Sequence, residues 1–574
     1  MRRTIFLLTI LCFFVLIPQI HAETDEIAET DVISEAETAE TVEPVVINRR
    51  PLIKTDNSFL GLPEYMNFQG GIDGGYDDVL WIGAGLRIDY SLGPFAVSGE
   101  ISFLNDQKYS PAAALLPAGD LGGFYFLLNE GGITYNGQIL QIAAGRFRNY
   151  DETNSPYSLF LNSDGISANT FKIRLESKYV FYQTQWIQLN WSSGVSSPAW
   201  NEYQRRKQNA DTTDPLSPFY PPNHWYQDSG VDPWDTSGLL TYGFPDRGLN
   251  IKIYGLKVKD WRFGFIDAAL YSQRPFDLEY FLIPLPMYFV QYFRTTEGRP
   301  WATQNNDKSI MGFFWDLDKK SWDAYAQLLI ADFSFGFLNV FLDEEYFSPN
   351  PWKLAWSLGG RVKTKIGNFG FHHAGALKYT FNPIGTNYEG LYAHDAANTA
   401  YGYTYYPETR YFVGNDAVNL TIQENMIGYK HGENNIAFQI DYQNTFYRFV
   451  ITSELEFVLA GSNSPANPWH DYDRRVNMYA DGKKGSQIFN DPQLEKRIEF
   501  RLNVSRQFGR FGTYAAIAIG GRFNRLELVP PDIDPHSGGA TRTVDDEIWI
   551  WKASDKHSLI FRMSIGFRYF LPII

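Results

Sequence analysis

Aromatic and polar side chains gather in two stretches of the sequence. One runs from Pro218 to Tyr226 and continues to Pro233-Trp234-Asp235, and the other runs from Asn467 to Asp473. Flat aromatic rings stack on the C–H faces of sugars, while Asn, Asp and His side chains suit sugar hydroxyls. The pattern indicates sugar binding, with Trp225, Tyr226, Trp234 and Trp469 as candidate contacts. The alternative is that these rings fasten loops together or lie in a membrane-interface belt.

Catalytic constellations are weak by comparison. His470, Asp471 and Asp473 suit a calcium ion or acid–base chemistry, but they fit a plain turn equally well. Neighbouring His372 and His373 fall in a strand pattern, where adjacent side chains face opposite sides, so they cannot share one metal ion. The sequence contains no nucleophile elbow, phosphate loop or dinucleotide fingerprint. We therefore predict no catalytic site, no metal and no cofactor, and hence a protein that is not an enzyme.

Alternating strand patterns recur along the chain. The last one places Leu559, Phe561, Met563, Ile565, Phe567 and Tyr569 on one face. Similar runs lie at 81–90, 436–443 and 497–504, and further candidates lie near 94–104, 121–135, 138–148, 171–191, 249–272, 308–317, 322–334, 352–382, 416–430, 445–460, 512–525 and 546–552. Split at Gly, Asn and Asp, they give roughly 16 to 18 strands, a normal number for a large outer-membrane β-barrel.

The polar faces of these strands carry charges of both signs. In a barrel they face the lumen, which predicts lumen positions for Arg87, Asp89, Arg497, Glu499, Arg501, Arg562 and Arg568. Such opposed charges either line an aqueous channel or form salt bridges across a crowded interior, and we favour the salt bridges.

Connections between the runs alternate in length. Tight ones are expected at 91–94, 259–260, 367–368 and 509–510, and long ones at 192–248, 274–307, 383–415, 461–494 and 526–545. Short periplasmic turns and long extracellular loops are typical of outer-membrane barrels.

The N-terminus predicts export. Arg2 and Arg3 precede a short apolar run, and Pro18 and Ala22 follow it, so residues 1–22 are interpreted as a Sec-type signal peptide. Cys12 is the only cysteine and lies in that segment, so the mature chain would lack thiols. Residues 23–50 are acidic and are predicted to be a disordered periplasmic segment, which leaves residues 51–574 for the barrel.

Composition agrees with this interpretation. Aromatic residues make up 17% of the 574 residues, yet mean hydropathy is only −0.29, as an aromatic-girdled barrel predicts. The net charge of −15 argues against nucleic acid as a partner. Expected partners are outer-membrane lipid and, because an aromatic residue stands near the C-terminus at Phe570, the barrel-assembly machinery.

Ordered short motifs across about residues 140–420 resemble the Wzi family of capsule-assembly proteins. They include Gly145-Arg146, the run from Ser158 to Ser163, Arg247-Gly248-Leu249, Pro284-Leu285-Pro286, Asn305-Asn306-Asp307-Lys308, the run from Tyr325 to Phe333, Tyr403-Thr404-Tyr405 and Gly414-Asn415-Asp416. Ala331 stands where the family tends to carry an aspartate, and an acidic segment stands in place of the N-terminal helical bundle of its best-known members.

The resemblance implies an 18-stranded, plugged barrel that acts as a lectin for secreted polysaccharide. It makes Arg146, Asn306, Asp307, Gln327 and Asp332 candidate polysaccharide-binding residues; the alternative is that they are structural hydrogen-bonding groups. Three functions remain open at this point. They are binding and anchoring of surface or capsular polysaccharide, transport of small solutes as a porin, and outer-membrane hydrolysis, in that order.

Overall fold

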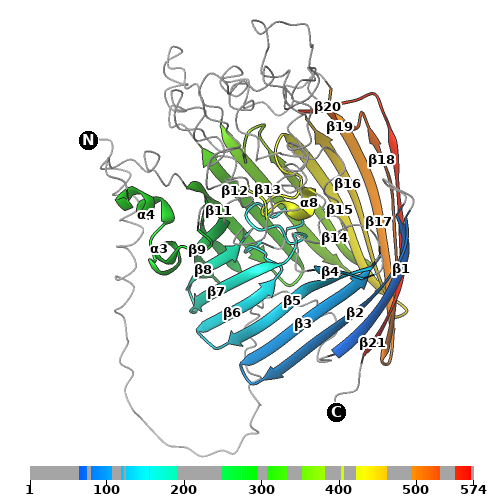
Figure 1. The fold of residues 1–574 in the computed structure, drawn as a ribbon, viewed down its shortest axis with the longest axis horizontal. Coiled ribbons are helices and arrows are strands. Elements are labelled where there is room, and N and C mark those ends of the chain that lie inside the picture. Colours follow the sequence, from blue (N-terminus) through cyan, green and yellow to red (C-terminus); the bar gives the residue numbers. More distant parts are fainter. Residues whose placement is uncertain are drawn as a thin grey trace, which may run out of the picture. The chain divides into compact units, whose positions relative to one another are not determined.

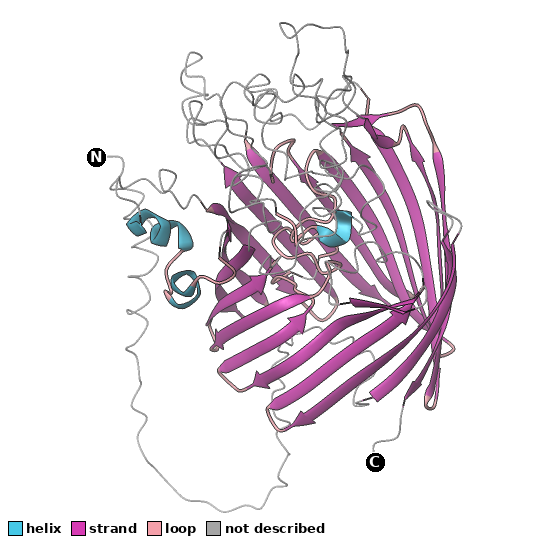
Figure 2. Ribbon diagram, viewed as in Figure 1, coloured by secondary structure: helices cyan, strands magenta, loops and turns pink. Residues whose placement is uncertain are grey.

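The computed structural model describes residues 64–73, 79–105, 118–121, 124–153, 155–189, 247–272, 274–294, 307–332, 352–381, 403–405, 422–461, 493–529 and 550–570. The chain divides after Arg50, and every described residue belongs to the unit Pro51–Ile574. Antiparallel strands dominate this unit, and short helices interrupt two of its long connections (Figures 1 and 2).

The strands of the first half are β1 (Glu64–Asp73), β2 (Val79–Leu92), β3 (Phe95–Leu104), β4 (Ala118–Leu121), β5 (Phe124–Asn136), β6 (Leu140–Phe147), β7 (Ala168–Glu176), β8 (Val180–Gln188), β9 (Arg247–Val258) and β10 (Trp261–Ser272). Helices α3 (Leu278–Leu282) and α4 (Met287–Arg294) follow. The second half contains β11 (Lys308–Asp318), β12 (Trp322–Asp332), β13 (Lys353–Thr364), β14 (Gly367–Ala376), α8 (Ile422–Asn425), β15 (Asn435–Phe446), β16 (Phe449–Ala460), β17 (Glu495–Phe508), β18 (Phe511–Phe523), β19 (Leu526–Val529), β20 (Ile550–Ala553) and β21 (Ser558–Phe570).

The main sheet closes on itself. It has 19 strands, and β1 pairs both with β2 and with the last strand, β21. Among the described residues β4 pairs only with β5. Without β4, the remaining 18 strands, β1–β3, β5–β18 and β21, form a closed antiparallel ring. Closure removes the unpaired edges of the sheet, which is the condition for strands to cross lipid.

Side-chain exposure follows the two-residue period of the strands. On β17, Ile498 and Phe500 are exposed while Arg497 and Glu499 are buried, and on β16 Leu455 is exposed while Glu456 is buried. The outer face of the ring is thus apolar and its inner face is polar, the reverse of a soluble barrel. The protein is an outer-membrane β-barrel, and the predicted fold class is confirmed.

None of the helices in the described part of the chain is long and apolar enough to cross a membrane.

Short turns join the strands at one rim. The pair Lys259-Asp260 joins β9 to β10, and Tyr447-Arg448 joins β15 to β16 with φ of 48° and 69° at its two residues. Two successive positive φ values are those of a type I′ hairpin turn, whose twist matches that of paired strands. The tight turns expected at 91–94, 259–260 and 509–510 are confirmed.

Three expectations about local structure are wrong or incomplete. The segment 416–430 contains helix α8 and an irregular stretch in its described part rather than a strand, because its apolar side chains pack inside the ring. The turn expected at 367–368 lies two residues earlier, since Thr364 pairs with Gly367. Strand β1 was not predicted, because Gly70 and Gly71 interrupt its alternation.

Candidate functional site

The connection between β6 and β7 folds into the ring (Figure 2). Its side chains Tyr157, Leu159 and Phe160 are fully buried. The Leu159 N–H donates to Gln327 Oε1 on β12 at 3.0 Å, and the Tyr157 hydroxyl donates to Glu456 Oε1 on β16 at 2.9 Å. Strands β6 and β16 lie on nearly opposite sides of the ring in strand order, so this segment crosses the interior.

Part of the connection between β14 and β15 lies beside it. The Asn162 N–H donates to the Ile427 carbonyl at 2.6 Å, and the Tyr403 hydroxyl donates to the Phe160 carbonyl at 2.9 Å. We call residues 148–153, 155–167, 403–405 and 422–434 together the plug. Its buried apolar side chains form one core with the inner faces of the strands; the members from the plug are Tyr157, Leu159, Phe160, Leu161, Tyr403, Tyr405, Met426, Ile427 and Tyr429.

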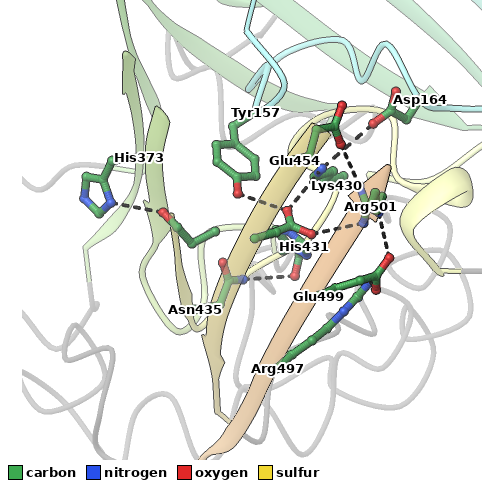
Figure 3. A network of polar contacts seen from close by, with 12 residues as sticks. Tyr157, Asp164, His373, Lys430, His431, Asn435, Glu454, Arg497, Glu499 and Arg501 are labelled. Carbon is green, nitrogen blue, oxygen red and sulfur yellow. Dashed lines mark hydrogen bonds and ion pairs between the residues drawn. The ribbon is translucent and has the colours of Figure 1, made fainter. Parts of the chain in front are cut away.

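Glu456 is the point at which the plug and the wall meet, and Figure 3 labels four of its partners: Tyr157, Lys430, His431 and Arg501. Its side chain is only 2% exposed. Oε1 accepts from the Tyr157 hydroxyl, from Lys430 Nζ at 3.2 Å and from His431 Nε2 at 2.9 Å, all in the plug. Oε2 faces Arg501 of β17 at 3.2 Å. These charge-assisted hydrogen bonds offset the free-energy cost of removing the Glu456 carboxylate from water.

Arginines surround a second carboxylate on the neighbouring strand. Glu499 is fully buried and accepts from Arg497 at 2.6 Å, from Arg501 at 2.6 Å and from Arg562 of β21 at 2.8 Å. Arg501 therefore joins the Glu499 cluster to Glu456 (Figure 3). The two carboxylates and their cations form one continuous network from the plug to β21.

Ion pairs also lie on β2 and β3, just beyond the seam between β21 and β1. Arg87 on β2 pairs with Asp89 at 2.6 Å and with Glu100 of β3 at 3.0 Å. The guanidinium of Arg568 lies 5.8 Å from the centre of the Tyr514 ring. The lumen charges named from the sequence are thus engaged in salt bridges or ring contacts within the wall.

A chain of hydrogen bonds links three strands beside the plug. The Tyr325 hydroxyl lies 2.8 Å from His372 Nδ1, and His372 Nε2 lies 2.6 Å from Asp441 Oδ2. His373, on the other face of β14, stacks on the Phe438 ring. The two histidines therefore point to opposite sides of the wall, as their adjacent positions in a strand predict.

Asp151 and His431 are among the titratable groups of the plug whose pKa values are perturbed. Burial raises the pKa of the Asp151 carboxyl, although hydrogen bonds from Gln327 and Thr153 oppose the shift. Burial lowers the pKa of His431, against the attraction of Glu456. His431 is therefore neutral at pH 7, and the bond to Glu456 requires its proton on Nε2.

The candidate ligands Gln327 and Arg146 make protein contacts. Gln327 is buried, accepting from Leu159 and donating Nε2 to Asp151 Oδ2 at 2.8 Å, so both ends of its amide bind the plug. Arg146 Nε donates to the Leu128 carbonyl at 3.0 Å. These are the structural hydrogen-bonding roles that stood as the alternative to saccharide binding.

Asp307 is remote from Gln327. It accepts from the Tyr280 hydroxyl at 2.7 Å and pairs with Arg274 at 2.5 Å, both in the segment between β10 and β11. That segment packs on the outer face of the ring, whereas Gln327 faces the lumen. Asp332 ends β12, and Asn306, Trp225, Tyr226, Trp234 and Trp469 lie outside the described residues.

Apart from Gln327, the residues that hold the plug were not predicted as site residues. Tyr157, Lys430, His431 and Glu456 come from two loops and a strand, and their order in the sequence carries no spacing signal. One sign was available, because Glu456 is a carboxylate among apolar residues of a strand. Among the described residues, no group of three or more His, Cys, Asp and Glu side chains is placed to hold a metal ion.

No protein family model matches the chain, and no curated protein sequence matches it. Solved structures similar to it are outer-membrane proteins. Wzi of Escherichia coli, described as an outer membrane protein involved in group 1 capsule assembly and a carbohydrate binding β-barrel, is 9% identical over 90% of this chain and 86% of that chain, with a TM-score of 0.48.

Two proteins of Pseudomonas aeruginosa are similar too. The outer membrane protein opdK is 9% identical over 89% of this chain and 98% of its own, with a TM-score of 0.37. OccK8 (OprE) is 9% identical over 89% of this chain and 97% of its own, with a TM-score of 0.39. These similarities do not assign the chain to a family.

Proposed function

We propose that this outer-membrane barrel is a plugged, non-enzymatic protein that binds surface polysaccharide and helps to assemble or anchor it at the cell surface. The observation that carries the proposal is the plug. A general porin needs a water-filled lumen, whereas here buried aromatic side chains of the plug pack against the inner faces of the strands.

The way the plug is held supports a permanent closure. Its hydrogen bonds reach β12, β13 and β16, through Gln327, Ser357 and Glu456. Buried, charge-assisted bonds of this kind are costly to break, because each leaves an uncompensated polar group. A segment that opened during transport would be held by fewer such contacts.

The ligand proposal rests on the sequence. Trp225, Tyr226, Trp234 and Trp469 stand in the two long aromatic connections, and connections of this length lie at the extracellular end of such barrels. Aromatic rings beside Asn, Asp and His offer stacking surfaces and hydrogen-bonding partners to a sugar chain at the cell surface.

The test measures conductance first and binding second. The refolded protein is inserted into a planar bilayer, and we expect a folded barrel without stable openings. Stable large openings would overturn the plugged barrel in favour of a small-solute channel.

Saccharide binding is then measured on a glycan array for the unaltered protein and for Trp225→Ala and Trp469→Ala. Trp261→Ala is the matched control, because Trp261 is exposed on the outer face beside a tight turn. We expect a loss of at least tenfold in affinity for the loop variants alone. Equal binding by all three variants would contradict the assignment of these loops.

A further inference from the structure

The segment 274–294, which contains α3 and α4, packs on the outer face of the ring. We call it the outer hairpin. On β8, Phe181 faces the lumen, since its ring lies under Arg174 and Arg262, both bound to Glu152 of the plug. Thr184, three residues later, therefore faces outward, and its Oγ1 donates to the Phe281 carbonyl of α3 at 2.9 Å.

Three polar side chains on this outer face find partners in the outer hairpin. Thr184, Lys252 and Asp267 lie side by side on β8, β9 and β10. Lys252 Nζ donates to the carbonyls of Ile283 and Leu285, the latter at 2.8 Å. Asp267 accepts from the Met287 N–H at the start of α4.

More contacts extend the covered area on both sides. Trp186 Nε1 of β8 donates to the Pro275 carbonyl at 2.7 Å, and Ser309 of β11 donates to Gln291 Oε1 at 2.9 Å. On the other strands the outer face is dominated by apolar side chains, and an uncovered lysine or aspartate against hydrocarbon would be costly. The outer hairpin thus replaces lipid as the partner of a polar area on the barrel wall.

The outer hairpin itself has two different sides. Tyr280, Met287 and Val290 are buried in a small core with Ala269 and Tyr271 of β10. The opposite side exposes large apolar side chains: Phe276, Leu278, Leu282, Leu285 and Phe293. Leu282 is 60% exposed and Phe293 is 73% exposed.

The exposed side continues the lipid-facing surface of the barrel. Phe313 on the neighbouring β11 and Leu328 on β12 are also exposed on the outer face. Strand β10 starts at the tight turn Lys259-Asp260 and enters the outer hairpin beyond Ser272. The hairpin therefore lies toward the rim of the long connections, which is the extracellular rim in barrels of this kind.

We propose that the outer hairpin is a membrane-embedded element whose exposed leucine and phenylalanine side chains contact the hydrocarbon of the outer leaflet, while its inner side shields Lys252 and Asp267 from that hydrocarbon. Amphipathic helices with a polar or packed side and an apolar side occupy the interface in this way. The inference concerns the lipid partner of the barrel and does not depend on what the barrel binds at the cell surface.

The test uses the cysteine content of the chain. In a Cys12→Ser background, which removes the only cysteine, single cysteines are introduced as Leu282→Cys and Phe293→Cys. Ile519→Cys on the outer face of β18 is the lipid control, and Lys178→Cys in the exposed turn after β7 is the water control. Each variant carries a nitroxide label and is reconstituted in phospholipid vesicles.

Electron paramagnetic resonance then compares collisions with oxygen, which concentrates in hydrocarbon, and with a water-soluble nickel chelate. We expect both hairpin labels to match the Ile519 label, with collisions dominated by oxygen. A nickel-dominated signal at either hairpin position, as at Lys178, would overturn the proposal. Protection from both reagents would overturn it too, because it would mean that protein rather than lipid covers the hairpin.

Discussion

The hydroxyl of Tyr157 donates to Glu456 Oε1 at 2.9 Å, although 299 residues separate the two in sequence. Tyr157 belongs to a loop that leaves the ring at β6, and Glu456 belongs to β16 on the far side. Lys430 and His431, from a third segment, bind the same carboxylate oxygen. This contact therefore fixes both parts of the plug to one point of the wall.

Glu456→Gln should loosen the plug. The amide keeps the size of the side chain but removes the charge that Lys430 and Arg501 face, and breaking a buried pair costs about 3–5 kcal/mol. We expect the free energy of unfolding in urea to fall by that order. Glu454→Gln is the control, because Glu454 is 34% exposed and faces only Arg501 among the described residues. Its free energy of unfolding should differ from that of the unaltered protein by at most about 1 kcal/mol. Equal losses in both variants would contradict the role of Glu456.

Tyr157→Phe should release the plug locally without unfolding the barrel. It removes one hydrogen bond to a charged acceptor, a loss of about 1.5–3 kcal/mol. Hydrogen exchange should accelerate at the amides of Leu159 and Asn162, whose N–H groups bind Gln327 and Ile427. Amides of β18, remote from the plug, serve as the internal reference. Unchanged exchange at Leu159 would mean that the plug does not depend on this contact.

His431 should make stability depend on pH. Its pKa is lowered in the folded protein, so below about pH 6.5 the unfolded chain binds more protons and the free energy of unfolding falls. This contribution is complete above the unfolded pKa and is lost as pH decreases toward the folded pKa. The free energy of unfolding, measured with urea between about pH 5 and pH 7.5, should rise less steeply with pH for His431→Gln than for the unaltered protein. Identical slopes would refute the prediction.

Gly312→Ala should push the plug away from β11. A Cβ at this position would meet the carbonyl oxygen of Leu328 and would come within 2.8 Å of Phe160 Cζ in the plug. We expect a loss of about 1–3 kcal/mol in the free energy of unfolding. Gly99→Ala on β3 is the matched control, because nothing lies within 4 Å of its added Cβ. The prediction fails if both substitutions have the same effect.

The wall of the barrel could be predicted from the sequence because its period is local. The alternation of Arg497, Ile498, Glu499 and Phe500 shows which side of β17 meets lipid, and the structure places these side chains accordingly. The run from Ser158 to Ser163, one of the motifs of the family resemblance, lies in the plug.

The interior could not be predicted in the same way. Residues 416–430 show apolar spacing close to that of a strand, but Met426 and Ile427 bury their side chains in the core inside the ring rather than against lipid. The spacing of apolar residues indicates which side chains are removed from water, but it does not indicate whether lipid or protein covers them. The outer hairpin was missed for a similar reason, because α3 and α4 fall in a connection expected to be an irregular loop.

The pairing of β1 with β21 also constrains when the barrel can form. Tyr65 pairs with Phe570, so the seam joins residues from opposite ends of the polypeptide. Until β21 has paired with β1, the assembling sheet carries two free edges that invite pairing with other strands. The seam is therefore the contact that closes the ring, and removal of β21 would leave every other strand present but the ring permanently open.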